Sequence, residues 1–152
     1  FAARGLTAAG ASTAFGLIGG VSIISRIASG YLADVMGSRR AFLASLVCAA
    51  AGIAMLFVPS VSIVVIAICL IGLGLGGSAT LYIPLLMGVY SPEKDTAIVG
   101  TFNVAIGVAA LAMPPLGTAS VEFTGSFTIA IFLTFAAAVG GLWVTAVGTA
   151  GP

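Results

Sequence analysis

Five long apolar runs, separated by short polar links, constrain this chain more than any other feature. Each run is close to the roughly 20 residues that a helix needs to cross the hydrocarbon core of a bilayer. A membrane β-strand would instead alternate apolar and polar residues over about ten positions. The pattern therefore predicts an all-α membrane protein with about five transmembrane helices, over residues 8–32, 41–58, 63–90, 97–116 and 127–147.

The scarcity of charge leads to the same conclusion. Of the 152 residues, 61% are hydrophobic and 6% are charged, whereas a typical soluble domain carries about 25% charged residues. So few charges cannot form a water-facing surface, and most of the surface must face lipid. The net charge of +1 gives no electrostatic basis for a nucleic-acid partner. The sequence contains no His, and both cysteines lie within apolar runs, so we expect no metal or cofactor.

The basic residues predict an orientation in the membrane. Arg39 and Arg40 lie in the first link and Lys94 lies in the third, and these links share one side of an antiparallel bundle. The opposite side carries Arg4. Because Lys and Arg accumulate in cytoplasmic loops, we expect a multi-pass cell-membrane protein whose N-terminus is outside and whose C-terminus is cytoplasmic.

Small residues recur every four positions in two of the predicted helices. Gly16 and Gly20 form such a stripe in the first helix, and Gly72 and Gly76 form one in the third. This spacing lets helix backbones approach closely in lipid. The stripes favour tight packing, and the alternative is a surface on which helices slide.

Arg26 lies inside the first apolar run and is the leading candidate for a functional side chain. A cation at membrane depth costs several kcal/mol, so it usually faces the protein interior or a water-filled cavity. Ser22, Ser29 and Gly30 are three or four positions away and are expected on the same helix face. Alternatively, the long side chain extends to the cytoplasmic interface. In a cavity, the guanidinium would suit an anion, because it can hold a carboxylate through two parallel hydrogen bonds.

Tyr82 and Asn103 are polar residues within apolar runs and are further candidates for a cavity wall. Their alternative role is hydrogen bonding between helices. Neither an acid pair nor a nucleophile with a neighbouring base is visible in the sequence. We therefore do not expect an enzyme.

The link after the first run contains Gly30, Asp34, Gly37, Arg39 and Arg40. We expect Gly30 to permit a close helix approach and Gly37 to permit a sharp turn. Asp34 is expected just before the second helix, where the helix dipole favours a negative charge. An ordinary charged loop is the alternative interpretation.

The pattern Gly-x-x-x-Asp-x-x-Gly-x-Arg-Arg in this link resembles the cytoplasmic loop motif of the major facilitator superfamily. Residues 26–30 resemble the eighth helix of the monocarboxylate transporters and the related oxalate/formate antiporters, where an Arg at this place contacts the substrate carboxylate. Residues 114–117 and 124–127 are similar to the link between helices eleven and twelve of that branch. The resemblance implies that residues 1–152 are most of the six-helix C-terminal half.

Two departures from that branch bear on the expected substrate and on its coupling to a proton. Ser22 stands where monocarboxylate transporters often carry an Asp, and Ile106 stands where the antiporters carry a Lys. A single cation favours a monocarboxylate over a dicarboxylate. Coupling to a proton stays open.

The resemblance thus implies a secondary active transporter that moves a small organic anion, such as a monocarboxylate, by alternating access. Its expected partners are that anion, the lipid bilayer and an N-terminal half of the same transporter, which this sequence lacks. A carrier of a different small solute and a non-transporting scaffold subunit are the alternatives. The expected substrate-binding residues are Arg26, Ser22, Asn103 and Tyr82, and the expected gating motif is Gly30, Asp34, Gly37, Arg39 and Arg40.

Overall fold

The computed structural model describes residues 8–58, 60–90 and 95–149, and within them nearly every residue is helical. All five helices of these ranges are long and apolar enough to span a membrane. The predicted all-α membrane fold is therefore confirmed. The helices are α1 (Ala8–Met36), α2 (Ser38–Met55), α3 (Val61–Val89), α4 (Asp95–Thr124) and α5 (Thr128–Gly148).

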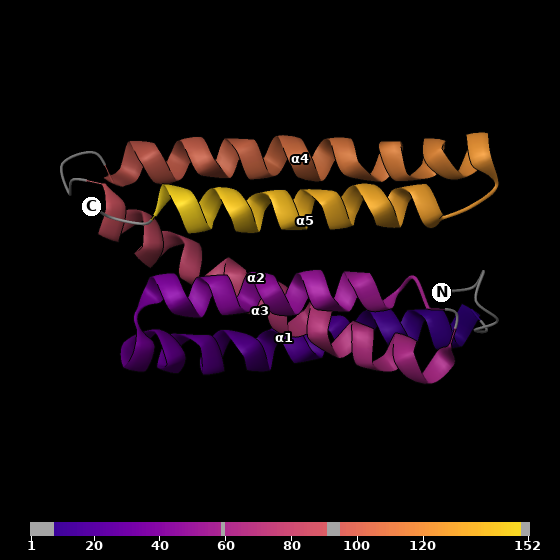
Figure 1. The fold of residues 1–152 in the computed structure, drawn as a ribbon, viewed down its shortest axis with the longest axis horizontal. Helices are drawn as coiled ribbons and strands as arrows, with labels where there is room; N and C mark the ends of the chain where they lie inside the picture. The colour runs from indigo at the N-terminus through magenta and orange to yellow at the C-terminus, as the bar shows by residue number, and fades with distance from the viewer. Residues whose placement is uncertain (1–7, 59, 91–94, 150–152) are drawn as a thin grey trace.

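Helix α3 is the centre of the structure. It runs obliquely between a layer formed by α1 and α2 and a layer formed by α4 and α5 (Figure 1), and it packs against both α1 and α2. The side chains of Ala67, Ile68 and Leu81 on α3 are at most 1% exposed. By contrast, residues 96–124 of α4 and all of α5 include no buried residue. The packed core therefore lies where α1, α2 and α3 meet.

The glycines of α3 allow this close packing. A methyl group at Gly72 would lie 2.9 Å from the Ile18 carbonyl oxygen of α1, and one at Gly74 would lie 2.5 Å from Ala49 Cβ of α2. The packing interpretation is confirmed for α3. Within the described structure the α1 stripe has no such contact, because a Cβ at Gly16 or Gly20 would have no described atom within 4 Å.

The link between α1 and α2 is shorter than predicted. Helix α1 continues to Met36 and α2 begins at Ser38, so Gly37 alone separates them. Its φ of 89° confirms the predicted turn, because this region favours glycine. The amide of Gly37 still donates to the Ala33 carbonyl at 2.9 Å, which carries the helical pattern through the charged segment. Asp34 thus lies in the last turn of α1, and its predicted place before the second helix is wrong.

Helix α4 also extends beyond the predicted end at residue 116. It continues through Pro114 and Pro115 to Thr124. Hydroxyl groups in this segment bond back to the helix: Thr118 donates to the Pro114 carbonyl at 3.0 Å, and Thr124 donates to the Ser120 carbonyl at 2.6 Å. These bonds satisfy hydroxyls within the helix, as is common for Ser and Thr in membrane helices. The remaining helix ends fall within three residues of the predicted ones.

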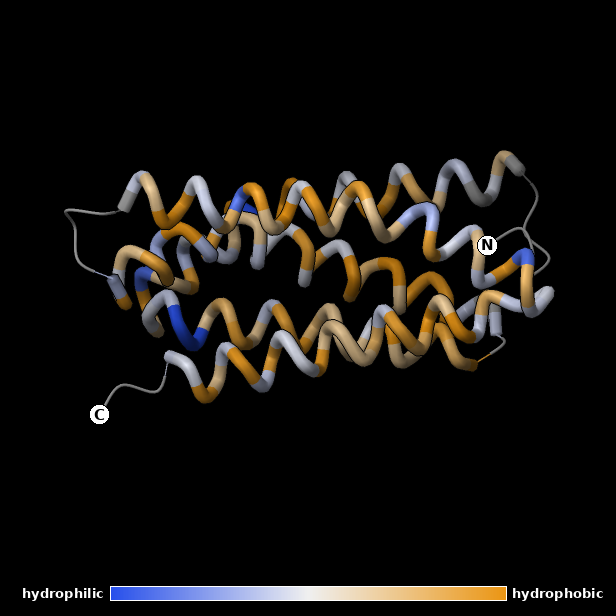
Figure 2. Tube along the Cα trace, turned by 90° about the horizontal axis from the view of Figure 1, so that it is seen from above, coloured by the Kyte–Doolittle hydropathy of each residue, from blue (hydrophilic) through white to orange (hydrophobic). Residues whose placement is uncertain are grey.

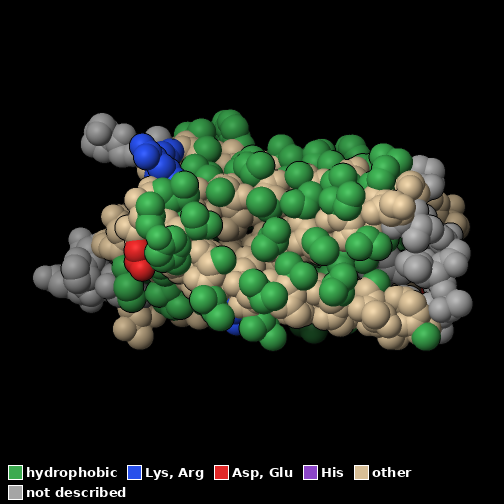
Figure 3. Space-filling model, turned by 90° about the horizontal axis from the view of Figure 1, so that it is seen from below, with side chains coloured by type: hydrophobic (Ala, Val, Ile, Leu, Met, Phe, Trp, Pro, Cys, Tyr) green, Lys and Arg blue, Asp and Glu red, His purple; other side chains and the backbone are tan. Residues whose placement is uncertain are grey.

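Apolar side chains cover the outside of the bundle. Leu111 and Ile27 are 79% and 77% exposed, and hydrophobic residues follow the helices along their length (Figure 2). On the face drawn in Figure 3, hydrophobic side chains dominate and charged ones gather mainly at one end. Such an exterior requires lipid, because water would face a large apolar surface. The protein is therefore a multi-pass membrane protein.

The α1–α2 link and the C-terminal end of α5 lie at the same end of the bundle, and the N-terminal end of α1 lies at the other (Figure 1). This arrangement is that of an antiparallel bundle with an odd number of spans. Arg4 and Lys94, on which the predicted orientation also depends, lie outside the described residues. The assignment of one end to the cytoplasm stays a prediction.

Candidate functional site

A cleft of about 530 Å³ lies among helices α1, α2, α3 and α4. It brings together three of the four residues predicted to bind substrate, which come from three different helices. All three lie within the membrane-spanning segments. The lining consists of Arg26, Phe42, Leu75, Ser78, Ala79, Tyr82, Asn103 and Ile106.

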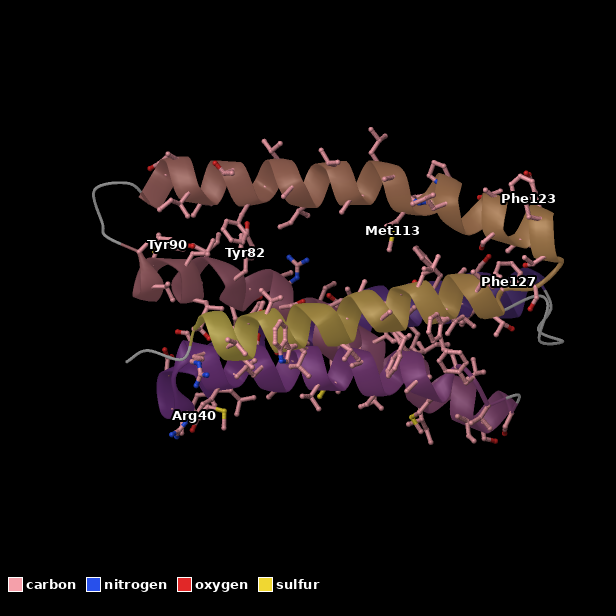
Figure 4. The ribbon with its side chains drawn as sticks, turned by 45° about the horizontal axis from the view of Figure 1, so that its top comes forward. Arg40, Tyr82, Tyr90, Met113, Phe123 and Phe127 are labelled. Carbon is pink, nitrogen blue, oxygen red and sulfur yellow. The ribbon has the colours of Figure 1, made fainter. Side chains whose placement is uncertain are left out.

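Tyr82 and Asn103 join two walls of this cleft. The Tyr82 hydroxyl donates to Asn103 Oδ1 at 3.0 Å, which links α3 to α4. Figure 4 shows Tyr82 reaching from α3 toward α4. The predicted helix–helix hydrogen bond is therefore present, and both residues also line the cleft. With its oxygen engaged, the Asn103 amide offers its N–H₂ group as a donor.

Arg26 supplies the charge of the cleft. Among the described residues that line it, Arg26 alone is charged, and no hydrogen bond or ion pair joins its guanidinium to a described residue. The Ser78 hydroxyl is engaged with the Leu75 carbonyl at 3.2 Å. The side-chain donors left to a ligand are therefore those of Arg26 and Asn103. Such a donor set complements an anionic acceptor and repels a cation.

Ser22 does not line this cleft. Its backbone carbonyl packs against Gly76 of α3 instead. The neighbouring serines also face α3: Ser25 is 5% exposed and donates to the Leu73 carbonyl at 2.5 Å, and Ser29 is 4% exposed. Ser22 and Ser29, which were predicted to share the cavity face of Arg26, do not line the cleft and face Gly76 and Gly77 of α3 instead. A separation of three or four positions leaves side chains about 40–60° apart around the helix, which is enough for Arg26 to line the cleft while the serines face α3. They fasten α1, and with it Arg26, against α3.

The residues of the predicted gating motif fall into different environments. Asp34 and Arg40 are exposed at the end of the bundle, and Arg40 points away from the helices (Figure 4). A Cβ at Gly30 would have no described atom within 4 Å, so the close approach expected there is absent from the described structure.

Arg39 has a role that the sequence did not indicate. Its Nε donates to Thr149 Oγ1 at 2.9 Å, and its Nη2 donates to the Ala146 carbonyl at 2.8 Å. The Thr149 hydroxyl in turn donates to the Thr145 carbonyl at 2.5 Å. Carbonyls at a helix C-terminus lack partners within the helix, and the helix dipole places negative charge there. Arg39 thus caps α5 and fastens it to the start of α2.

We expect Arg39→Ala to lower the free energy of unfolding by about 2 kcal/mol, because it removes two hydrogen bonds from a charged donor. Arg40→Ala is the matched control, and its effect is expected within about 0.5 kcal/mol. Thermal unfolding of both variants in detergent measures the difference. Equal losses in the two variants would show that the α5 contact contributes nothing.

Sequence reasoning missed four residues of the cleft, which are Phe42, Leu75, Ser78 and Ala79. Ser78 precedes Tyr82 by four positions and so shares its helix face, which is a usable signal. Phe42 lies in the first turns of α2, and nothing in its local sequence indicates which helices it faces.

Long apolar helices around a partly polar cleft within the membrane-spanning region define a polytopic membrane protein. The model of the Major Facilitator Superfamily matches residues 2–151, so the chain belongs to this family of secondary transporters. The predicted superfamily is confirmed, and the monocarboxylate branch within it stays a prediction. Comparison with curated proteins and with solved structures gave no significant match.

Proposed function

We propose that this chain is most of the C-terminal half of a secondary transporter that moves a small monocarboxylate by alternating access. One observation carries the proposal. Arg26 lies in a membrane-embedded cleft with no acidic residue in its described lining and no described partner for its guanidinium. An unpaired cation in such a place is costly, and an anionic substrate would offset that cost.

The remaining lining supports a substrate with one carboxylate. Ile106, Leu75 and Phe42 present apolar surface beside the cation. A second carboxylate would be desolvated there without a cation to pair with, which is strongly unfavourable. By the resemblance to the oxalate/formate antiporters, the apolar Ile106 stands where they carry a Lys as a second cation.

In this mechanism, the substrate binds near the bilayer midplane between the two halves of the carrier. The guanidinium of Arg26 holds both carboxylate oxygens, and the Asn103 amide donates a further hydrogen bond. The N-terminal half closes the site from the other side, and rocking of the halves exposes it to each side in turn. The link that contains Asp34, Gly37 and Arg40 stabilises one end state at the cytoplasmic face.

Transport in proteoliposomes containing the complete carrier tests this function. We expect uptake of a labelled monocarboxylate that unlabelled monocarboxylate blocks. A dicarboxylate of similar length and the neutral amide of the same acid are each expected to compete at least tenfold more weakly. Equal competition by the amide would instead favour a carrier of neutral solutes, and no flux of any solute would favour a scaffold subunit. An imposed pH gradient in the same vesicles tests proton coupling.

A further inference from the structure

A second cavity, of about 330 Å³, adjoins the Arg26 cleft. Phe42, Tyr82 and Ile106 line both spaces. The two spaces therefore meet at these three residues, and the second cavity lies next to the cleft that holds the cation. The second cavity continues between α3, α4 and α5 toward Tyr90 and Thr149. Its volume lies within the range of small-ligand pockets, about 300–1,000 Å³.

The second cavity is apolar. No charged residue is among its described lining, which includes Leu85, Leu86 and Phe102. The hydroxyls of its two threonines are hydrogen-bonded within α5: Thr145 donates to the Gly141 carbonyl at 2.8 Å, and Thr149 donates to the Thr145 carbonyl. The Tyr82 hydroxyl donates to Asn103. The cavity therefore suits a hydrocarbon group and offers little to a polar one.

We propose that this cavity binds the hydrocarbon tail of an amphiphilic monocarboxylate whose carboxylate is held by Arg26. The proposal rests on the proposed function of the Arg26 cleft and specifies its substrate class: straight-chain or aromatic carboxylates rather than the smallest acids. The occupant follows from the geometry, because an apolar cavity adjoins the cleft that holds the cation. Each methylene that enters the cavity is expected to raise affinity about fourfold.

Competition by the straight-chain acids from acetate to octanoate, against uptake by the complete carrier, tests the proposal. Two variants fill the cavity from α5, Gly148→Leu and Val144→Trp. A Cβ at Gly148 meets no described atom within 4 Å, so the larger side chain has room to enter. Gly140→Leu is the matched control, because it lies on the same helix, is equally unobstructed and is outside the cavity lining.

In the parent protein, inhibition should strengthen about fourfold per methylene until the cavity is full. Both filling variants should weaken inhibition by octanoate at least tenfold and leave inhibition by acetate unchanged. Gly140→Leu should change inhibition by neither acid. A flat response to chain length in the parent, or an unchanged response in both filling variants, would overturn the proposal.

Two further experiments distinguish failure of this inference from failure of the proposed function, and distinguish a substrate tail in the cavity from a bilayer lipid. Arg26→Gln should weaken inhibition by acetate and inhibition by octanoate to the same extent. An unchanged affinity for acetate would refute the proposed function itself. Neutral alcohols of matched length should inhibit at least tenfold more weakly than the acids. If the alcohols inhibit as strongly as the acids, and Arg26→Gln does not change their inhibition, the cavity binds apolar chains in general, such as those of bilayer lipid. That result would overturn the proposal that Arg26 holds the carboxylate while the cavity holds the tail.

Discussion

Replacing Arg26 with Ala is expected to abolish anion uptake while leaving the protein inserted in the membrane. The substitution removes the one charged group in the described lining of the cleft. Removing one partner of a charge-assisted hydrogen-bonded pair costs about 1.5–3 kcal/mol, which corresponds to a loss of about tenfold or more in binding. The initial rate of labelled monocarboxylate uptake measures the effect, and the amount of protein in the membrane fraction measures insertion.

Two companion variants make this result specific. Arg26→Lys keeps the charge but loses the two-pronged geometry, so we expect partial uptake with a raised KM. Glu122→Gln removes an exposed charge near the end of α4, away from the cleft, and should leave uptake unchanged. Uptake kinetics of Arg26→Ala close to those of the parent would rule out its role at the substrate.

The existence of the helices could be predicted because a membrane span has simple requirements. It needs sufficient length and few charges, and both are visible in a single sequence. The helix ends were harder to predict, because polar residues do not stop a helix when they can be satisfied locally. Asp34 is exposed at the end of α1, and Thr118 and Thr124 bond to carbonyls of α4 itself. The two helices therefore extend past the predicted ends.

The candidate site was predictable for residues whose chemistry is unusual in lipid. Arg26, Tyr82 and Asn103 stood out as polar groups within apolar runs, and the structure gathers them around one cleft. Ser22 was predicted to line the cleft but does not, because the rotation of α1 about its own axis is set by the packing of α1 against α3. Phe42 was missed because a phenylalanine in an apolar helix carries no such signal.

The contact between Arg39 and α5 could not be predicted for a different reason. Thr149 is 110 positions away in the sequence, and an Arg beside another Arg in a link already satisfies the rule for cytoplasmic loops. Only the folded arrangement shows that Arg39 caps a helix while Arg40 is exposed. Two adjacent residues of one type therefore have separable roles, which the paired substitutions described above resolve.

A close backbone contact between α2 and α3 leads to the second large expected effect. Gly74→Ala should lower the free energy of unfolding by about 2–3 kcal/mol, in the range measured for overpacked cores. The added methyl group would lie 2.5 Å from Ala49 Cβ, 2.6 Å from its backbone nitrogen and 2.7 Å from its Cα. A backbone cannot rotate away as a side chain can, so α2 and α3 must separate. Thermal unfolding in detergent measures the loss.

The control for Gly74→Ala is Gly140→Ala, which makes the same chemical change in α5 where no described atom lies within 4 Å of the added Cβ. Because Ala favours a helix more than Gly does, this control should be neutral or more stable by up to about 1 kcal/mol. The double variant Gly74→Ala/Ala49→Gly tests the cause. It removes the clash with Ala49 Cβ but keeps the two backbone contacts, so only part of the stability should return. Full recovery would show that the side chain alone limits the approach of α2 to α3, and equal stability of Gly74→Ala and Gly140→Ala would show that the backbones can separate without cost.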